Sequence, residues 1–426
     1  MLERSIETAR IHRDGNVSRR SFLKTLGLGT AGLALGWHDR LLAESLTMRK
    51  LGKSVIVLWM QGGPSQFETF DPKSGSDGSQ TGTIQTAVPG VEIADFWPKV
   101  AKQMNDIALI RSMTNKEGNH QRATYQLHTG YAPSGTLKHP SFGSLVASEI
   151  APRDFDLPAF VSVLGPSSSS GFLPVSYSPF RVQDPTKLPQ NAESFVANER
   201  FDRRIDLLNS LEMSYASAGA SQQVKDHQTL YNQAARLVKS PKLAAFDLQK
   251  EDEKIRAMYG NSAFAKGCLL ARRLVESGVT YVEVQLGNWD THDNGKERVG
   301  QLAGQCDSAF AGLVADLKSR GMLDSTLVVW MGEFGRTPKV NPRGGRDHYP
   351  RAFNVAVAGC GIKGGNVIGS TNASGSDVAK RPVTPNDLFF TFCKQLGIDP
   401  AKENQSPVGR PLKIVDGGSL VKELIT

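Results

Sequence analysis

Side chains that can bind a metal ion or move a proton gather after the short apolar runs of this sequence. The run 279–286 (VTYVEVQL) is followed by GNWDTHDN, which contains Asp290 and His292. If the strand continues, these two side chains point to the same side, because alternate residues of a strand share a face. A carboxylate and an imidazole that converge suit Zn²⁺, Mn²⁺ or Fe. The alternative is a turn whose Asp and Asn side chains cap the next helix.

A second polar segment follows the apolar run 325–331 (STLVVWM). It reads GEFGRTP and contains Glu333 and Arg336. A glutamate directly after a buried strand is costly unless it is paired or bound to a metal. We therefore expect Arg336 either to pair with Glu333 inside the protein or to hold an anionic group in a bidentate way.

Two further histidines belong to this set of candidates. His348 lies in GGRDHYP, before the apolar run 353–358, and the paired glycines of this segment allow a tight turn. Together with Asp290 and His292, it completes a three-ligand set for a metal ion. His120 lies at the expected start of a helix, where it is a ligand, an acid or base, or a hydrogen-bonded structural histidine.

The first strand end is also polar. Residues 54–60 (SVIVLWM) are followed by QGGPSQFETFDPK, in which Gly62 and Gly63 allow close approach of the backbone to a ligand. Glu68 and Asp71 of this segment either face the site or only organise the loop.

The apolar runs alternate with helical patterns along the chain. We expect strands at 54–60, 107–110, 160–164, 279–286, 325–331 and 353–358, and helices at 120–129, 262–277, 301–320 and 385–396. This alternation predicts an α/β fold in which a mostly parallel sheet is covered by helices on both faces. Ligands of such sheets bind beyond the carboxyl ends of the strands, which is where the candidate residues lie.

Composition narrows the function classes. The 426 residues carry 50 Lys and Arg against 42 Asp and Glu, a net charge of +8 without a basic block. A nucleic-acid partner is therefore not expected. The four cysteines, Cys268, Cys306, Cys360 and Cys393, form no CxxC pair, so we expect them to be buried small apolar residues.

The beginning of the chain resembles an export signal. Arg19 and Arg20 are followed by Phe-Leu-Lys and by an apolar stretch rich in Gly and Ala, too short for a stable bilayer anchor. We interpret residues 1–43 as a twin-arginine signal region, which predicts a periplasmic or extracellular protein without a transmembrane anchor after signal removal. This route carries folded proteins, often with a metal inserted, and so favours a metalloprotein.

The helical stretch 191–278 is expected to be an insertion that serves as a lid or as a partner surface.

The sequence motifs and their order along the chain resemble those of the DUF1501 family, which is similar to sulfatases and alkaline phosphatases. The resemblance rests on the twin-arginine start and on GGPSQFETFDPK, NHQRATYQLHTGY, HPSFGS, WDTHDN, GEFGRTP, GGRDHYP, RPVTPNDLFFTFCKQLGIDP and GRPL. It implies that residues 44–426 form an alkaline-phosphatase-like three-layer αβα sandwich. It further implies that Asp290, His292 and His348 form the first metal position, with Glu333 where the superfamily has the Asp of an Asp-His pair.

The chain also departs from the superfamily pattern. Phe334 replaces the His of that pair, and His120 stands near the place of the usual Ser, Thr or modified Cys nucleophile. The usual ligands of the second metal are missing, so the site holds one metal, is rebuilt, or is inactive.

Two hypotheses follow. The first is an exported metal-dependent hydrolase of a sulfate or phosphate ester. Its substrate would be a small anionic ester or a sulfated or phosphorylated glycan, and its metal zinc, manganese or calcium. In this hypothesis Asp290, His292, His348 and Glu333 are metal ligands, His120 is an acid, base or nucleophile, Glu333 is a ligand or base, and Arg336 holds the anion. The second hypothesis is a non-catalytic exported binding or assembly protein that keeps the fold and a structural metal.

Overall fold

The computed structural model describes residues 52–74, 78–152, 155–192 and 196–425. The predicted signal region 1–43 lies outside these residues. The chain divides into two units at Ser54, and the fold described below belongs to the second unit. In the described residues, no helix combines the length and the apolar character needed to cross a lipid bilayer.

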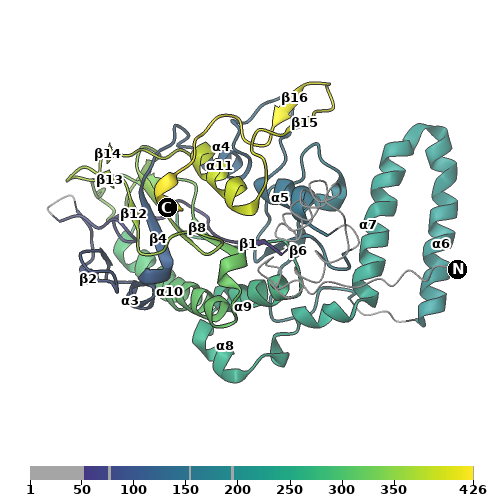
Figure 1. Cartoon of the computed structure of the whole chain (residues 1–426), viewed down its shortest axis with the longest axis horizontal. Helices are drawn as coiled ribbons and strands as arrows, with labels where there is room; N and C mark the ends of the chain where they lie inside the picture. Colours follow the sequence, from purple (N-terminus) through teal and green to yellow (C-terminus); the bar gives the residue numbers. More distant parts are fainter. Residues whose placement is uncertain (1–51, 75–77, 153–154, 193–195, 426) are drawn as a thin grey trace, which may run out of the picture. The chain divides into compact units, whose positions relative to one another are not determined.

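An eight-stranded sheet forms the centre of this unit, with the strand order β12-β4-β11-β8-β1-β7-β5-β6 (Figure 1). The strands are β1 (Ser54–Met60), β4 (Ile107–Met113), β5 (Phe160–Val163), β6 (Phe180–Val182), β7 (Tyr281–Leu286), β8 (Thr326–Met331), β11 (Phe353–Ala358) and β12 (Val367–Ile368). All neighbouring pairs are parallel except those of β11, which runs antiparallel to both β8 and β4. The predicted mostly parallel sheet is therefore confirmed.

Helices cover both faces of the sheet, because both faces of its strands are apolar. In β1, Ile56 and Leu58 pack in one core with α3 (Pro98–Lys102), α9 (Ala263–Glu276) and α10 (Gly295–Ser319). Val57 and Trp59 of the same strand pack on the other face, with α4 (His120–Thr129), α5 (Phe142–Ile150) and α11 (Pro385–Leu396). Figure 1 shows α9 and α10 on one side of the strands and α4, α5 and α11 on the other. The predicted three-layer αβα sandwich is confirmed.

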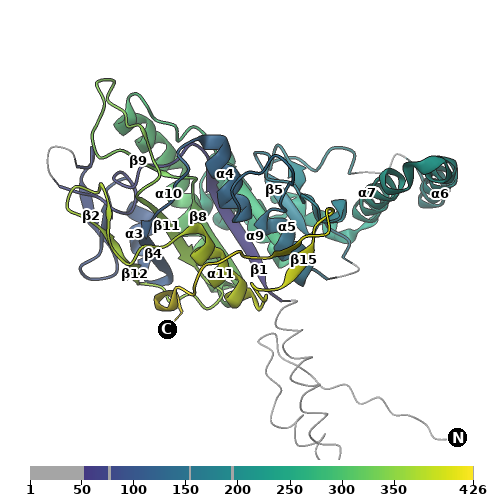
Figure 2. The same cartoon turned by 90° about the horizontal axis from the view of Figure 1, so that it is seen from above.

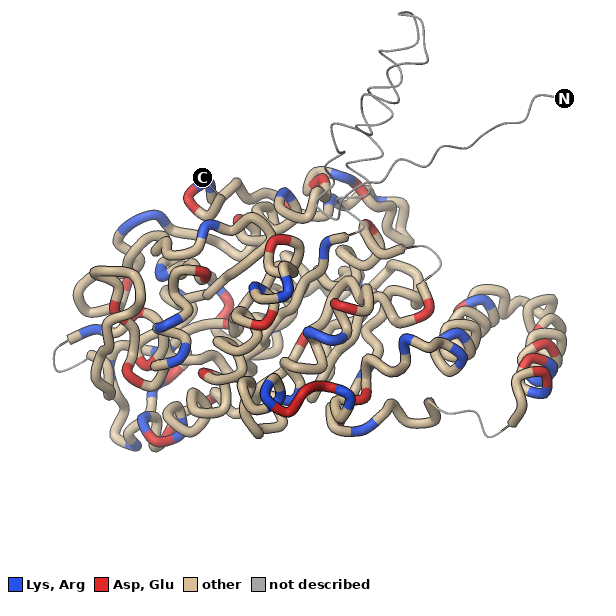
Figure 3. Tube along the Cα trace, turned by 60° about the horizontal axis from the view of Figure 1, so that its bottom comes forward, with Lys and Arg blue, Asp and Glu red and all other residues tan. Residues whose placement is uncertain are grey.

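Most predicted elements agree with the structure within two residues, and α10 is the main exception. It begins at Gly295 rather than at residue 301, after Asn294 in the left-handed region with φ 46°. Its first turns are polar, so the apolar periodicity did not reveal them. The four cysteines are buried and form no disulfide, as expected. Lys and Arg are interspersed with Asp and Glu along the described chain (Figure 3).

The predicted insertion 191–278 contains several kinds of element. It holds α6 (Asn198–Tyr215), a π-helical turn η3 (Ala216–Ala220), α7 (Ser221–Lys239), two 3₁₀ turns (Pro241–Phe246, Leu248–Lys250), α8 (Glu253–Tyr259) and the core helix α9. The lid role of this segment stays a prediction. The remaining strands form two-stranded antiparallel sheets: β2 (Thr83–Gln85) with β3 (Glu92–Ala94), β9 (Gly335–Arg336) with β10 (His348–Tyr349), β13 (Ser370–Thr371) with β14 (Val378–Lys380), and β15 (Glu403–Gln405) with β16 (Pro411–Lys413).

A buried ionic network joins α9 to α10. The Arg272 side chain is fully buried, and its Nε lies 2.8 Å from Asp316 Oδ2. Asp316 also accepts a hydrogen bond from the Tyr259 hydroxyl (2.9 Å) and one from Arg320 Nε (2.7 Å). Since a buried guanidinium needs a counter-charge, this network holds the two helices in register.

We expect Asp316→Asn to lower the free energy of unfolding by about 2 kcal/mol, because the charged hydrogen bonds weaken while Arg272 stays buried. Denaturant unfolding followed by circular dichroism measures the change. Asp324 is exposed, so the control Asp324→Asn should change the free energy by less than about 0.5 kcal/mol. An equal loss in both variants would contradict a role for this network.

Candidate metal centre

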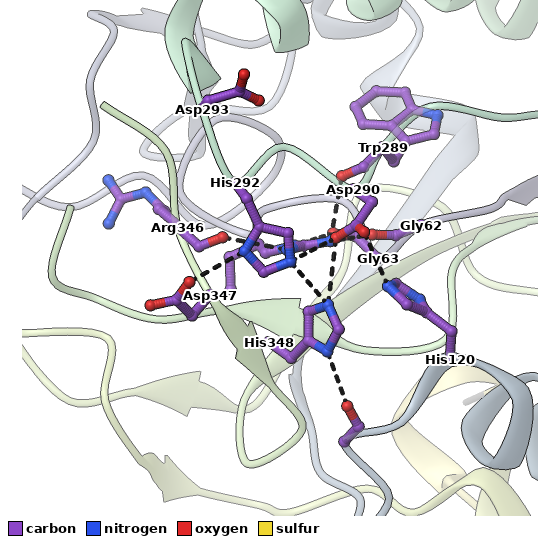
Figure 4. Close-up of polar contacts among 12 residues, drawn as sticks. Gly62, Gly63, His120, Trp289, Asp290, His292, Asp293, Arg346, Asp347 and His348 are labelled. Carbon is purple, nitrogen blue, oxygen red and sulfur yellow. Dashed lines mark hydrogen bonds and ion pairs between the residues drawn. The ribbon is translucent and has the colours of Figure 1, made fainter. Parts of the chain in front are cut away.

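The candidate residues meet at one edge of the sheet. His120 follows β4, Asp290 and His292 follow β7, and Glu333 follows β8, at the carboxyl ends of strands that run in one direction. His348 instead precedes β11, and because β11 runs in the opposite direction, its amino end lies at the same edge. Opposite strand directions thus bring residues from before and after strands into one site (Figure 4).

The Asp290 carboxylate is the centre of this group. Its oxygens lie 2.9 Å from His292 Nε2, 3.2 Å from His348 Nε2 and 3.3 Å from His120 Nε2. Arg336 Nη2 donates to the same carboxylate at 2.6 Å. Burial alone would raise the pKa of Asp290, but the hydrogen bond and the charge of Arg336 outweigh it and lower this pKa to about 2. Asp290 is therefore an anion surrounded by imidazoles.

Each of the three imidazoles has its Nδ1 atom held by an oxygen. The partners are Asp347 Oδ1 for His292 (3.0 Å), the Gly118 carbonyl for His348 (2.9 Å) and Glu333 Oε1 for His120 (2.7 Å). Because a carbonyl or carboxylate oxygen only accepts, these contacts assign a proton to Nδ1 in each ring. The Nε2 lone pairs are then turned toward Asp290. Metal-binding histidines are held in this way by the groups behind them.

The resulting donor set fits a cation. His120, Asp290 and His348 offer ligand atoms that all lie within 4.8 Å of one another. His292 Nε2 lies 3.0 Å from His348 Nε2, and two ring nitrogens without protons cannot hydrogen-bond to each other. A bound cation would satisfy both lone pairs. The side chains of the three histidines and of Asp290 are 27–43% exposed, whereas the Nε2 atom of His120 itself is buried.

Glu333 stands behind His120, where it is fully buried. Its Oε1 accepts hydrogen bonds from the Gly62 backbone (2.9 Å) and from His120 Nδ1. The hydrogen bond to Glu333 raises the pKa of His120. Glu333 Oε2 is buried and has no hydrogen-bond partner among the described residues. The sequence predicted that this carboxylate is paired or metal-bound, and the structure provides His120 and Gly62 as its partners.

Arg336 pairs with Asp290 instead of Glu333. Its guanidinium is fully buried, and it donates to the carbonyls of Gly63 (2.8 Å), Arg346 (3.1 Å) and Gly62 as well as to Asp290. Burial lowers the pKa of Arg336. With its donors used inside the protein, Arg336 orients the Asp290 carboxylate. The expected pairing with Glu333 is therefore not observed, and the internal partner of Arg336 is Asp290.

Two glycines allow the loops to meet. Gly62 has φ +116°, and a Cβ there would lie 2.4 Å from the Asp290 backbone nitrogen. A Cβ at Gly345 would lie 2.1 Å from the His292 carbonyl carbon. The loops after β1 and before β11 therefore touch the Asp290–His292 segment backbone to backbone, which only glycine permits.

Sequence reasoning missed some supporting residues. Asp347 and Gly118 hold His292 and His348 from behind, and the Phe334 ring packs 4.9 Å from the His120 ring and 4.7 Å from the His348 ring, centre to centre. Of these supporting residues, only Asp347 could have been found from the sequence, because it directly precedes the candidate ligand His348.

The two carboxylates in the loop after β1 have partners of their own. Glu68 accepts from Arg346 (2.9 Å) and Asp71 from Lys73 (2.8 Å), and both carboxylates are buried. Of the two roles that the sequence left open, these contacts favour organisation of the loop.

Gly62→Ala should disrupt the site, because its Cβ must displace the Asp290 backbone. We expect it to lower the free energy of unfolding by about 2 kcal/mol more than Gly90→Ala. Gly90 also has positive φ, +78°, but has no neighbour within 4 Å, so it controls for backbone strain alone. Denaturant unfolding measures both variants. Equal destabilisation would mean that the loops have room to separate.

Some solved structures are similar to this chain at low sequence identity and low TM-score. A sulfatase from Pseudoalteromonas sp. is 14% identical, with 83% of this chain and 71% of that chain covered and a TM-score of 0.38. A mutant of the TAB5 alkaline phosphatase with Mg bound is 12% identical, with 81% and 98% covered and a TM-score of 0.38. The lipoteichoic acid synthase of Listeria monocytogenes is 12% identical, with 82% and 72% covered and a TM-score of 0.35. At these TM-scores the likenesses carry no argument about activity.

No curated protein matches this chain. The sequence profile of the family described as "Protein of unknown function (DUF1501)" matches residues 52–425, which include nearly all of the chain that the structure describes. The motifs at 61–73, 119–131, 288–294 and 344–350 lie within that match. The chain therefore belongs to the DUF1501 family.

Proposed function

We propose that this protein is a metal-dependent hydrolase whose metal ion is held by Asp290, His120, His292 and His348. The observation that carries the proposal is the orientation of the three imidazoles, each held at Nδ1 by an oxygen so that Nε2 faces the Asp290 carboxylate. Nitrogen and oxygen donors together suit Zn²⁺, Mn²⁺ or Fe. Calcium takes oxygen ligands, so the three imidazoles disfavour it.

In this proposal His120 is a ligand rather than an acid, base or nucleophile. Its Nδ1 is engaged by Glu333, and its Nε2 faces Asp290. Glu333 then has a supporting role, because it holds the His120 ring and keeps its proton on Nδ1. Arg336 is assigned a similar role toward Asp290.

The reaction that fits this arrangement is attack of a water molecule on a sulfate or phosphate ester, with release of an alcohol. When bound, the metal supplies a Lewis acid that lowers the pKa of water and polarises the ester oxygen. The chain turns the Nε2 atoms of the three imidazoles toward Asp290 and fixes the Asp290 carboxylate. The substrate class we propose is a small anionic ester or a sulfated or phosphorylated glycan. The twin-arginine motif at Arg19 and Arg20 favours a site of action outside the cytoplasm.

One observation favours the alternative of a structural metal in a non-catalytic protein. Four protein donors are as many as a closed tetrahedral site uses, whereas catalytic zinc sites keep a position for water. The partial exposure of the Asp290, His292 and His348 side chains favours the catalytic function, since solvent reaches these side chains. Turnover by the metal-loaded protein separates the two functions.

Elemental mass spectrometry of protein purified without chelator tests the metal site. We expect about one ion per chain in the wild type. The Asp290→Ala/His292→Ala variant should lose it, because two of the four donors are removed. Asp293→Ala/His227→Ala removes the same residue types away from the donor set and should retain the metal. A folded wild-type protein that takes up no Zn²⁺, Mn²⁺ or Fe would overturn the proposal.

The metal-loaded wild type should hydrolyse p-nitrophenyl sulfate or p-nitrophenyl phosphate. Chelation should abolish the activity and metal should restore it, and Asp290→Ala should lower kcat/KM on the order of 10³-fold. Full metal occupancy without hydrolysis of these esters or of sulfated and phosphorylated glycans would support the structural alternative.

Asp347→Asn tests the support behind His292. We expect metal affinity to fall by about 10–100-fold, because the neutral amide oxygen of Asn holds the Nδ1 proton of His292 more weakly than the carboxylate does. Competition with a chromogenic chelator measures the affinity. The matched control is Asp293→Asn, since Asp293 pairs with Arg298 rather than with a candidate ligand. Equal affinities in the two variants would remove Asp347 from the site.

A further inference from the structure

Exposed apolar side chains gather on the two long helices of the insertion. Eight large hydrophobic residues are exposed in the described chain, and six of them lie on α6 and α7. They are Leu207, Leu211, Met213 and Tyr215 on α6, and Leu230 and Tyr231 on α7. Single exposed apolar residues are normal, but a group on one element marks an interaction site. Figures 1 and 2 both show α6 and α7 side by side.

The exposed residues of α6 form a stripe separate from its contact with α7. Glu212 is the only buried residue of this 18-residue helix, and it pairs with His227 of α7. Leu207, Leu211 and Tyr215 are 60–67% exposed and recur every fourth residue, so they lie along one face of the helix. We call Arg204, Leu207, Leu211 and Tyr215 the α6 stripe, since Arg204 is exposed and lies on this same face.

Besides the Glu212–His227 pair, α6 contacts α7 through Lys239, which pairs with Asp202 and lies over the Phe201 ring. In proteins most helical stability comes from burial of an apolar face against other parts of the structure. A partner that covers the α6 stripe would supply that burial.

We propose that the partner is a second copy of this chain, whose α6 stripe packs antiparallel against the first. The stripe is complementary to itself. In an antiparallel pair centred between Leu207 and Leu211, each of these leucines faces the other leucine of the second copy. Arg204 then faces Tyr215 of the second copy, which allows a cation–π contact. The two-fold axis repeats every contact, as in an isologous dimer.

Charge argues against a lipid surface as the partner. Amphipathic helices that bind membranes carry Lys and Arg on their polar face. The first half of α6 instead mixes three arginines with three acidic residues, Glu199, Asp202 and Asp206, so it has no net charge (Figure 3). The stripe is short, so we expect a weak dimer near the lower size limit of specific interfaces.

Sedimentation velocity over the micromolar range tests the dimer. We expect a monomer–dimer equilibrium in the wild type, and at least about a tenfold weaker association in Leu207→Asp/Leu211→Asp. Val408→Asp places the same charge at a residue that is 72% exposed between β15 and β16, and it should leave the equilibrium unchanged. Circular dichroism checks that both variants fold. A wild type that is monomeric at every concentration overturns the proposal, and its binding to phosphatidylglycerol vesicles would assign the stripe to a lipid surface instead.

Disulfide cross-linking tests the register. Arg204→Cys and Tyr215→Cys are made in separate proteins, and the four native cysteines stay buried. The mixture should form a cross-linked dimer on mild oxidation, because these positions face each other. Arg204→Cys alone should not, since two copies of this position lie about 15 Å apart along an antiparallel pair. Cross-linking of either protein alone at the rate of the mixture, or none in the mixture, overturns the register.

Discussion

The ion pair between Arg336 and Asp290 is the interaction on which the site depends. A fully buried guanidinium is costly unless its charge and its donors are satisfied, and here the partners come from the loops after β1 and β7. Those loops must therefore lie where Asp290, Gly62 and Gly63 can receive the guanidinium. Because Asp290 in turn contacts three imidazoles, the same pair sets the centre around which His120, His292 and His348 are arranged.

The direction of one strand completes the donor set. A parallel sheet brings together only residues that follow strands, and His348 precedes one. The antiparallel β11 places its amino end beside the carboxyl ends of β8 and β4. The short β9–β10 ladder then fixes His348 opposite Arg336 in register. One reversed strand thus adds an imidazole that a purely parallel sheet would leave at the opposite edge.

The groups behind the ligands distinguish this site from a set of polar residues that merely lie close together. Each ring is oriented by an acceptor from a different segment, Asp347, Glu333 or the Gly118 carbonyl. Such acceptors are what a metal ligand needs, because they fix the tautomer before the metal arrives. The α6 stripe shares no residue with this site, so the proposed association of two copies and the proposed metal chemistry can be tested separately.

The sequence by itself determined the elements and most of the candidate residues. Apolar runs such as 54–60 predict buried strands because both faces of a covered sheet exclude water, and Asp290, His292 and His348 stand at predictable strand ends. The direction of β11, the pairing of Arg336 with Asp290 and the placement of Glu333 behind His120 were decided only by the tertiary structure. Each depends on which segments, far apart in the chain, become neighbours, and local periodicity carries no information about that choice. The first turns of α10 escaped prediction for a related reason, since their polar residues show no apolar period and contact the loop before β11 through Gly344.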